Sequence, residues 1–426
     1  MSFHGGILLS NDQVIELTSL IETAKILNSS LDYKFILNHI MLASMGKLVV
    51  SKSAAFVNLF SSTASDRNLL KLSKGIVLEK DILAKLLELG FEGSVGAAQE
   101  DGSRDPLDSS PSAHEDLRKM LAAAGVGRVF PIRSSHHLFG YLLIGKKLLG
   151  GEFTPAEVEF VSTLCNIATM AIDNARLFEE SLAKQRLEEE LNLARTIQEK
   201  LLPKEMPEFP GCTVSAFHVP TKQVGGDYFD VIRLSDRLLC VAIADVSGKG
   251  FPAALLMANL QSAFRALVTS GLQIAEVCEK LNQIVYGNTE SDKFITFFAA
   301  IYDSKNRVLR YVNAGHNYPF VIKSDRKVNR LDKGGIMLGV MEDITYETGE
   351  EKVGSGDLVY LFTDGVCEAM NSREEQFTEE KLEEILVINS SSVPADILKV
   401  VRNKVASFVG DAPQSDDITQ VCVKFL

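Results

Sequence analysis

The stretch LLCVAIADVSGKG, residues 238–250, decides the fold of the C-terminal half because it ends an apolar run with an aspartate. Eight of its first nine residues are apolar, and the exception is Asp245, a pattern typical of a buried β-strand. SGKG then supplies two glycines, and an apolar helical pattern follows from Pro252. A carboxylate at such a strand end is held near the edge of a sheet, and flanking glycines let backbone and ligand approach closely.

The same arrangement recurs at three other places. GGDYFD contains Asp227, VYLFTDG places Asp364 after an apolar run, and Asp416 with Asp417 precedes the run 418–425. A single aspartate before a glycine is most often a turn residue. Several carboxylates in one pocket repel one another unless cations neutralise them, and an all-oxygen set favours Mg²⁺ or Mn²⁺. Zinc is disfavoured because these segments contain no His, and Cys240 lies inside the apolar run, away from the strand end.

Two such ions, about 3.5–4 Å apart, hold a bridging water, lower its pKa and stabilise an in-line attack on a phosphoryl group. This chemistry needs no covalent enzyme intermediate. The aspartates therefore predict a metal-dependent hydrolase.

Residues 211–426 alternate strand-like and helical patterns. The links at 304–307 and 314–318 are too short for a helical crossover, so neighbouring strands are expected to be antiparallel. This predicts an α+β domain with two packed sheets. The expected strands are 238–246, 294–302, 308–313, 358–363 and 418–425, and the expected helices are 252–269, 274–287 and 394–409.

Five ordered motifs cover most of residues 212–426: GGDYFD, ADVSGKG followed by AALLMA, NAGHNYP, TDGVCEA and DDIT. They resemble the SpoIIE-type branch of the PPM serine/threonine phosphatases. The resemblance implies an αββα sandwich with two divalent cations, Mn²⁺ or Mg²⁺. It implies that Asp245 bridges both ions, that the carbonyl of Val246 and the segment of Asp227 serve one, and that Asp364 and Asp416 serve the other. The four aspartates are then the catalytic residues, and Asp417 lies outside the ligand set.

By this resemblance, the expected function is dephosphorylation of phosphoserine or phosphothreonine on a protein. The expected substrate is a phosphorylated STAS-domain anti-sigma-factor antagonist. The rival reading is a nonenzymatic signalling scaffold with a phosphatase-like fold. Such a scaffold should have lost metal carboxylates, whereas all four are present here.

The N-terminal half has the pattern of a separate α/β/α domain. Apolar spacing predicts two helices within residues 14–50, and β-prone runs lie at 53–60, 129–132 and 139–144. Residues 92–115 are rich in Gly, Ser, Asp and Ala and are expected to form a loop. This region resembles a GAF sensor domain, which would span residues 1–175 and bind a ligand that the sequence does not name.

A helical linker is expected at residues 176–205, before a phosphatase domain at 206–426. TPAE at 154–157 starts a helix, and neither Pro nor Gly interrupts residues 156–202. LARTIQEKLLP, residues 193–203, resembles the linker of RsbU-like regulators. Its apolar stripe fits either a helix packed on its own domain or a two-chain coiled coil, and its position between sensor and catalyst favours a homodimer. The stripe consists of Leu187, Leu191, Ala194, Ile197 and Leu201.

Three further features of the sequence each allow two interpretations. Lys249 fits either contact with substrate phosphate or a solvated loop. His316 fits either an acid or, with more weight, a brace for its loop. Cys367 and Arg373 match the spacing of cysteine phosphatases, but Glu368 beside the thiol would raise its pKa and repel phosphate.

The composition limits the classes of possible partner and the location in the cell. The net charge of −12 argues against binding to nucleic acid or to an anionic membrane. The six cysteines are scattered and are expected to be reduced, mostly buried thiols. Uninterrupted apolar runs are much shorter than the ~20 residues of a membrane span, and the first residues lack a secretory signal. A cytoplasmic location is expected.

Overall fold

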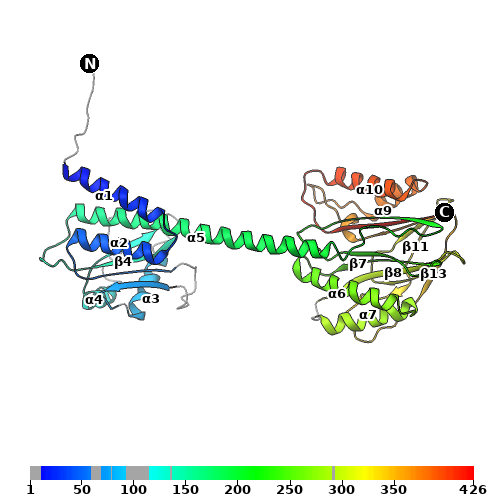
Figure 1. Cartoon of the computed structure of the whole chain (residues 1–426), viewed down its shortest axis with the longest axis horizontal. Coiled ribbons are helices and arrows are strands. Elements are labelled where there is room, and N and C mark those ends of the chain that lie inside the picture. Colours follow the sequence, from blue (N-terminus) through cyan, green and yellow to red (C-terminus); the bar gives the residue numbers. More distant parts are fainter. Residues whose placement is uncertain (1–10, 59–68, 78, 93–114, 135–136, 290–292) are drawn as a thin grey trace, which may run out of the picture. The chain divides into compact units, whose positions relative to one another are not determined.

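The chain folds into two compact units, residues 1–185 and 186–426. A computed structural model describes residues 11–58, 69–77, 79–92, 115–134, 137–289 and 293–426 (Figure 1). The division between the units lies inside the segment 176–205 that was expected to link two domains.

The first unit contains an antiparallel four-stranded sheet with the order β2-β1-β4-β3. Its strands are β1 (Ser53–Asn58), β2 (Leu69–Lys74), β3 (Val126–Arg133) and β4 (Leu138–Gly145). Its helices are α1 (Asn11–Asn28), α2 (Tyr33–Leu48), α3 (Lys80–Glu92), α4 (Glu115–Ala123) and α5 (Pro155–Gln198), which continues into the second unit.

Helices cover both faces of this sheet, because alternate residues of a strand point to opposite sides. Ala55 and Val57 of β1 pack in one core with α2 and α5, whereas Ala54 and Phe56 pack in another with α3 and α4. The α/β/α layering agrees with the expectation. Strand β2 and helices α3 and α4 were not predicted. Residues 59–68 and 93–114, which include most of the expected loop, lie outside the described residues.

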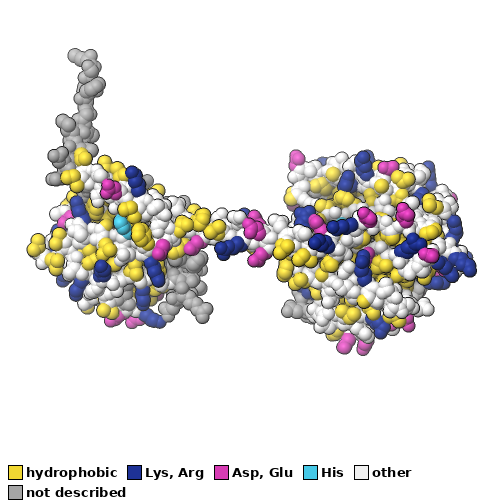
Figure 2. Space-filling model, viewed as in Figure 1, with side chains coloured by type: hydrophobic (Ala, Val, Ile, Leu, Met, Phe, Trp, Pro, Cys, Tyr) yellow, Lys and Arg dark blue, Asp and Glu magenta, His cyan; other side chains and the backbone are white. Residues whose placement is uncertain are grey.

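Helix α5 begins at a reciprocal cap. The Glu157 amide donates to Thr154 Oγ1 at 3.3 Å, and the Thr154 amide donates to Glu157 Oε2 at 2.7 Å. Farther along, Leu187 and Ile197 are each 56 % exposed, so the stripe residues do not all pack on their own domain. Figure 2 shows hydrophobic side chains among those of both charges on this stretch of α5.

The second unit is built from two sheets. The five-stranded sheet has the order β11-β10-β14-β15-β5, and the six-stranded sheet has the order β12-β9-β8-β7-β6 with β13 paired to β9. The strands of the first are β5 (Cys212–Val219), β10 (Phe320–Ile322), β11 (Val328–Arg330), β14 (Leu358–Phe362) and β15 (Ile418–Phe425). Those of the second are β6 (Tyr228–Arg233), β7 (Leu238–Val246), β8 (Ile295–Asp303), β9 (Val308–Ala314), β12 (Gly334–Gly335) and β13 (Gly349–Lys352).

The two sheets pack face to face between helical layers. Val359 and Leu361 of β14 belong to the core shared with the six-stranded sheet, whereas Tyr360 and Phe362 face the helices on the outer side. Figure 1 shows α6 (Phe251–Val268) and α7 (Ile274–Asn288) on one side of the sandwich, with α9 (Glu379–Asn389) and α10 (Pro394–Val409) on the other. The expected α+β domain with two packed sheets is confirmed.

Of the described helices, only α6 is long and apolar enough to cross a membrane by length and composition. Met257, Leu260 and Phe264 of α6 are fully buried in the core beside the six-stranded sheet. These contacts are those of a core helix.

All six cysteines are buried and unpaired, as expected.

Candidate metal centre

The structure brings the four predicted aspartates to one region of the sandwich. Asp227 directly precedes β6 and lies beside Asp245 of β7, because Tyr228 pairs with Ala244. Asp364 follows β14 as the first residue of α8 (Asp364–Cys367), and Asp416 lies just before β15. The residues therefore come from the ends of strands in both sheets.

Burial and mutual repulsion govern the charge of these carboxyl groups. Burial, followed by the charges of Asp364 and Asp416, raises the pKa of Asp245 to about 7. Burial and then Asp416 raise the pKa of Asp364 to about 6. The pKa of Asp227 is raised well above its ordinary value by burial and then by Asp245. Divalent cations would relieve this repulsion, and an oxygen donor set suits Mg²⁺ or Mn²⁺.

Among the described residues, no three acidic, His or Cys side chains converge tightly enough to hold a metal ion as they stand. The all-oxygen character of the site and its mutual repulsion fit a divalent cation. The ligand roles of Asp227, Asp245, Val246, Asp364 and Asp416 stay predictions.

Two threonine hydroxyls hold Asp227. Thr363 Oγ1 donates to Asp227 Oδ2 at 2.8 Å, and Thr419 Oγ1 donates to the same oxygen. Both threonines are fully buried, and they come from the five-stranded sheet's side of the sandwich. They tie the Asp227 segment to the elements that carry Asp364 and Asp416. Sequence reasoning missed them, although the threonines of the TDG and DDIT motifs were a signal.

An imidazole extends this network. His218 Nδ1 of β5 lies 2.8 Å from Thr419 Oγ1. Because the Thr419 hydroxyl donates to Asp227, His218 Nδ1 carries its hydrogen and donates to Thr419. Burial lowers the pKa of His218, which favours this neutral imidazole. No local motif marked His218, so it was not predicted.

Asp417 fixes the glycine loop before Asp227. Its Oδ1 accepts from the Thr221 amide at 2.7 Å, and its Oδ2 accepts from the Gly226 amide at 2.8 Å. Both oxygens are thus engaged by the backbone. This role suits the expectation that Asp417 lies outside the ligand set.

The glycines in these motifs allow close backbone contact. A Cβ atom on Gly226 would lie 2.9 Å from the carbonyl oxygen of Val246, and one on Gly365 would lie 2.0 Å from that of Asp417. The Val246 carbonyl is therefore beside the Asp227 segment, which is where the resemblance requires it.

Asp230 of the same GGDYFD motif is an anchor. It is fully buried, and Arg265 of α6 binds it through Nε at 2.7 Å and Nη2 at 2.9 Å. The pair joins α6 to β6.

Lys249 is the counter-charge of Asp416. Its ammonium lies 2.8 Å from Asp416 Oδ2 and donates to the Ser415 carbonyl at 2.7 Å. Its side chain is 44 % exposed, and both interpretations, contact with substrate phosphate and a solvated loop lysine, stay predictions.

His316 braces its loop. It is buried, its Nε2 donates to the Phe362 carbonyl at 3.0 Å, and its Nδ1 accepts from Thr296 Oγ1 at 2.9 Å. Burial lowers its pKa to about 4, so the ring is neutral near pH 7. These contacts favour the loop-bracing interpretation over the acid.

Cys367 is not a nucleophile. Its thiol is buried, and burial raises its pKa further from the thiolate range, while Arg373 is exposed and pairs with Glu375. The cysteine-phosphatase spacing is accidental.

Gln198, the last residue of α5, forms hydrogen bonds with the same glycine loop. Gln198 Nε2 donates to the Gly225 carbonyl at 2.7 Å, and the Gly225 amide donates to Gln198 Oε1 at 3.1 Å. The linker thus makes paired hydrogen bonds two residues from Asp227. The sequence had not indicated this contact.

In a comparison with known proteins, residues 235–426 match the family model described as stage II sporulation protein E (SpoIIE). The chain is 33 % identical over 186 residues to phosphoserine phosphatase RsbU of Bacillus subtilis, covering 43 % of this chain and 55 % of that protein. It is 25 % identical over 184 residues to phosphoserine phosphatase RsbP of the same organism, covering 42 % and 45 %. The chain therefore spans about half the length of these curated relatives.

Among solved structures, the SiaA-PP2C domain of Pseudomonas aeruginosa aligns with a TM-score of 0.52 at 20 % identity. The alignment covers 57 % of this chain and 99 % of that domain. This likeness shows a PP2C-like fold. The C-terminal half thus has a PP2C-like fold and is similar in sequence to the SpoIIE family.

Proposed function

From this similarity to the SpoIIE family and the PP2C-like fold, we propose that the chain is a metal-dependent protein serine/threonine phosphatase. The observation that carries the proposal is the placement of Asp227, Asp245, Asp364 and Asp416 in one region, held by hydrogen bonds between both sheets. Relatives named phosphoserine phosphatases support the same reaction class.

Each residue has a distinct part in the proposed reaction. Asp245 would bridge two cations, with Asp227 and the Val246 carbonyl on one and Asp364 and Asp416 on the other. Bound Mn²⁺ or Mg²⁺ would activate water and offset the charge of the phosphoryl group. Thr363 and Thr419 keep the Asp227 carboxylate oriented, and Asp417 keeps its loop in place.

The proposal is tested by phosphate release from a phosphoserine peptide in the presence of manganese. Asp245→Asn and Asp364→Asn should each abolish release, because each removes a carboxylate from the site. Asp343→Asn, an exposed aspartate elsewhere in the second unit, is the matched control and should keep full activity. Undiminished turnover in either site variant would refute the mechanism.

We propose a phosphorylated STAS-domain anti-sigma-factor antagonist as the substrate, because the motifs and linker resemble RsbU-like regulators. The Asp364→Asn protein should retain its phosphoprotein during purification. Identification of a bound partner without a STAS domain would reject this assignment.

The proposed control runs from a GAF-like sensor in the first unit through the helical linker, with an unnamed ligand as signal. The Gln198–Gly225 pair supports it, because it joins the end of α5 to the Asp227 loop. We also propose that the chain forms a homodimer through residues 176–205. Its proposed location is the cytoplasm, and neither nucleic acid nor a membrane is a proposed partner. If no ligand or partner of the first unit alters activity of the full chain, that unit has no regulatory role.

A further inference from the structure

Two hollows lie side by side on the outer face of the five-stranded sheet, along α10. The first has a volume of about 290 Å³ and the second of about 410 Å³. Phe217 of β5 and Arg402 of α10 line both. The two hollows therefore adjoin at this pair of residues, and we call them together the α10 groove.

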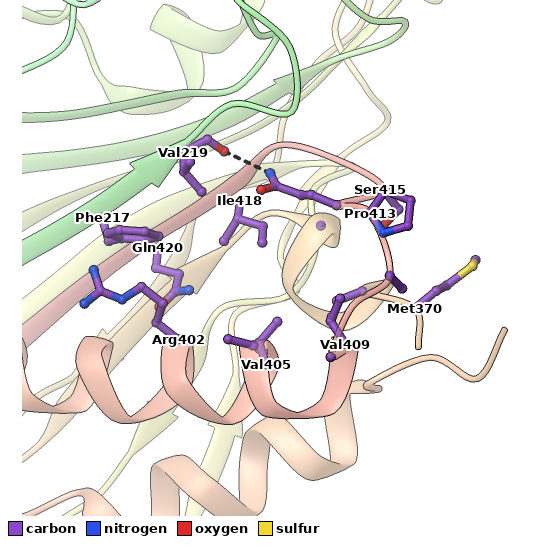
Figure 3. Close-up of a pocket in the computed structure, with 16 residues that line it drawn as sticks. Phe217, Val219, Met370, Arg402, Val405, Val409, Pro413, Ser415, Ile418 and Gln420 are labelled. Carbon is purple, nitrogen blue, oxygen red and sulfur yellow. Dashed lines mark hydrogen bonds between the residues drawn. The ribbon is translucent and has the colours of Figure 1, made fainter. Parts of the chain in front are cut away.

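The first hollow is mainly apolar with one unsatisfied donor. Figure 3 shows Phe217, Arg402 and Gln420 together at one end, with Val405 and Val409 of α10 farther along. Gln420 is fully buried, and its Oε1 accepts from the Tyr360 hydroxyl at 2.8 Å. Its Nε2 has no hydrogen-bond partner among the described residues. A buried amide without a partner is costly, so an occupant with an acceptor would stabilise it.

The second hollow is cationic. Lys204, Lys399 and Arg402 line it, and no ion pair joins any of them to a carboxylate in the described part of the chain. The lining of both hollows includes no acidic side chain, although the chain carries a net charge of −12. This local excess of positive charge suits an acidic ligand.

The groove adjoins the candidate metal centre. Gly365 and Ser415 line the first hollow, and they are the chain neighbours of Asp364 and Asp416. A peptide in the groove therefore has its next residues close to the aspartates.

We propose that the α10 groove docks an acidic segment of the phosphoprotein substrate, with an aromatic side chain as its anchor. A tyrosine fits the first hollow best, because its ring is apolar and its hydroxyl accepts a hydrogen bond from Gln420. Flanking carboxylates pair with Lys399 and Arg402. This inference rests on the proposed function, because it assigns the groove to the substrate of the same centre.

The test measures binding separately from catalysis. The probe is an unphosphorylated fluorescent peptide with glutamates on both sides of one tyrosine, and its binding to the full chain is followed by fluorescence anisotropy. Lys399→Gln with Arg402→Gln should weaken binding roughly tenfold, because two exposed ion pairs are lost. Lys404→Gln, on the same helix but outside both hollows, is the control and should bind as the wild type does.

Peptide variants test the chemistry of the occupant. Replacing the tyrosine by alanine should weaken binding at least about tenfold, and replacing the glutamates by glutamines should remove its salt dependence. Equal affinity of the tyrosine and alanine peptides, or of the wild type and the double variant, overturns the proposal. Free tyrosine binding as tightly as the peptide also overturns it and indicates a metabolite pocket.

Turnover of p-nitrophenyl phosphate separates this inference from the proposed function. The double variant should hydrolyse it as the wild type does, because this small substrate needs no groove. Turnover without peptide binding rejects the groove alone. Peptide binding without any turnover rejects the phosphatase, and with it the assignment of the groove to a substrate.

Discussion

The Thr419 hydroxyl stands between two groups that the sequence separates widely, the His218 imidazole and the Asp227 carboxylate. Removing it by Thr419→Val should weaken manganese binding about tenfold or more, because groups that orient a metal ligand have effects of this size. Calorimetric titration of the full chain with Mn²⁺ measures the change. Thr213→Val is the control, because Thr213 is exposed and lies at the other end of β5 from His218. Equal affinity in Thr419→Val and the wild type would show that this hydroxyl does not position Asp227.

The raised pKa values of Asp245 and Asp364 also set a dependence on pH. Both values lie above the ordinary aspartate range, so folding favours the protonated groups when metal is absent. Their contribution to stability is full below about pH 4 and is lost as the pH rises through about 6 and 7. Mn²⁺ binds the ionised groups, so it should raise the Tm more at about pH 8 than at about pH 5. A metal-induced shift that does not grow with pH would contradict this, and Asp245→Asn with Asp364→Asn should abolish the difference.

At the scale of elements, the end of α5 and the glycine loop form a connected pair. Gln198→Leu removes both hydrogen bonds to Gly225 and leaves two backbone groups without a side-chain partner. The manganese concentration for half-maximal activity should rise about tenfold, because the loop that carries Asp227 loses its support. Lys200→Leu is the control, because Lys200 is exposed and lies two residues after Gln198. If Gln198→Leu and the wild type have the same manganese dependence, the Gln198–Gly225 hydrogen bonds have no part in the proposed control.

Long elements with clear borders were predictable. The expected bounds of β7, β15 and α10 coincide with the observed ones, because each is an apolar pattern that ends at a charged or turn-forming segment. Strands β10, β11 and β12 have only two or three residues, too few to show a period. The grouping of the four aspartates was predictable because each lies within two residues of the end of a strand. The partners of Asp227 were not, since 192 residues separate it from Thr419 and 136 from Thr363.

At the scale of the whole molecule, the exposed stripe of α5 bears on assembly. Leu187→Glu with Ile197→Glu should convert the proposed dimer into a monomer, because charges replace apolar contacts between two helices. Analytical ultracentrifugation measures the mass. Asn192→Glu with Thr196→Glu adds the same charge to exposed positions off the stripe and is the control. A wild-type chain that sediments as a monomer would reject the dimer.

The buried cysteines are distributed unevenly: the first unit holds Cys165 alone, whereas the second holds the other five. A thiol reagent can modify them only when the surrounding core opens. The stoichiometry of modification in mild denaturant therefore identifies which unit unfolds first, one equivalent for the first unit or five for the second, without any added label.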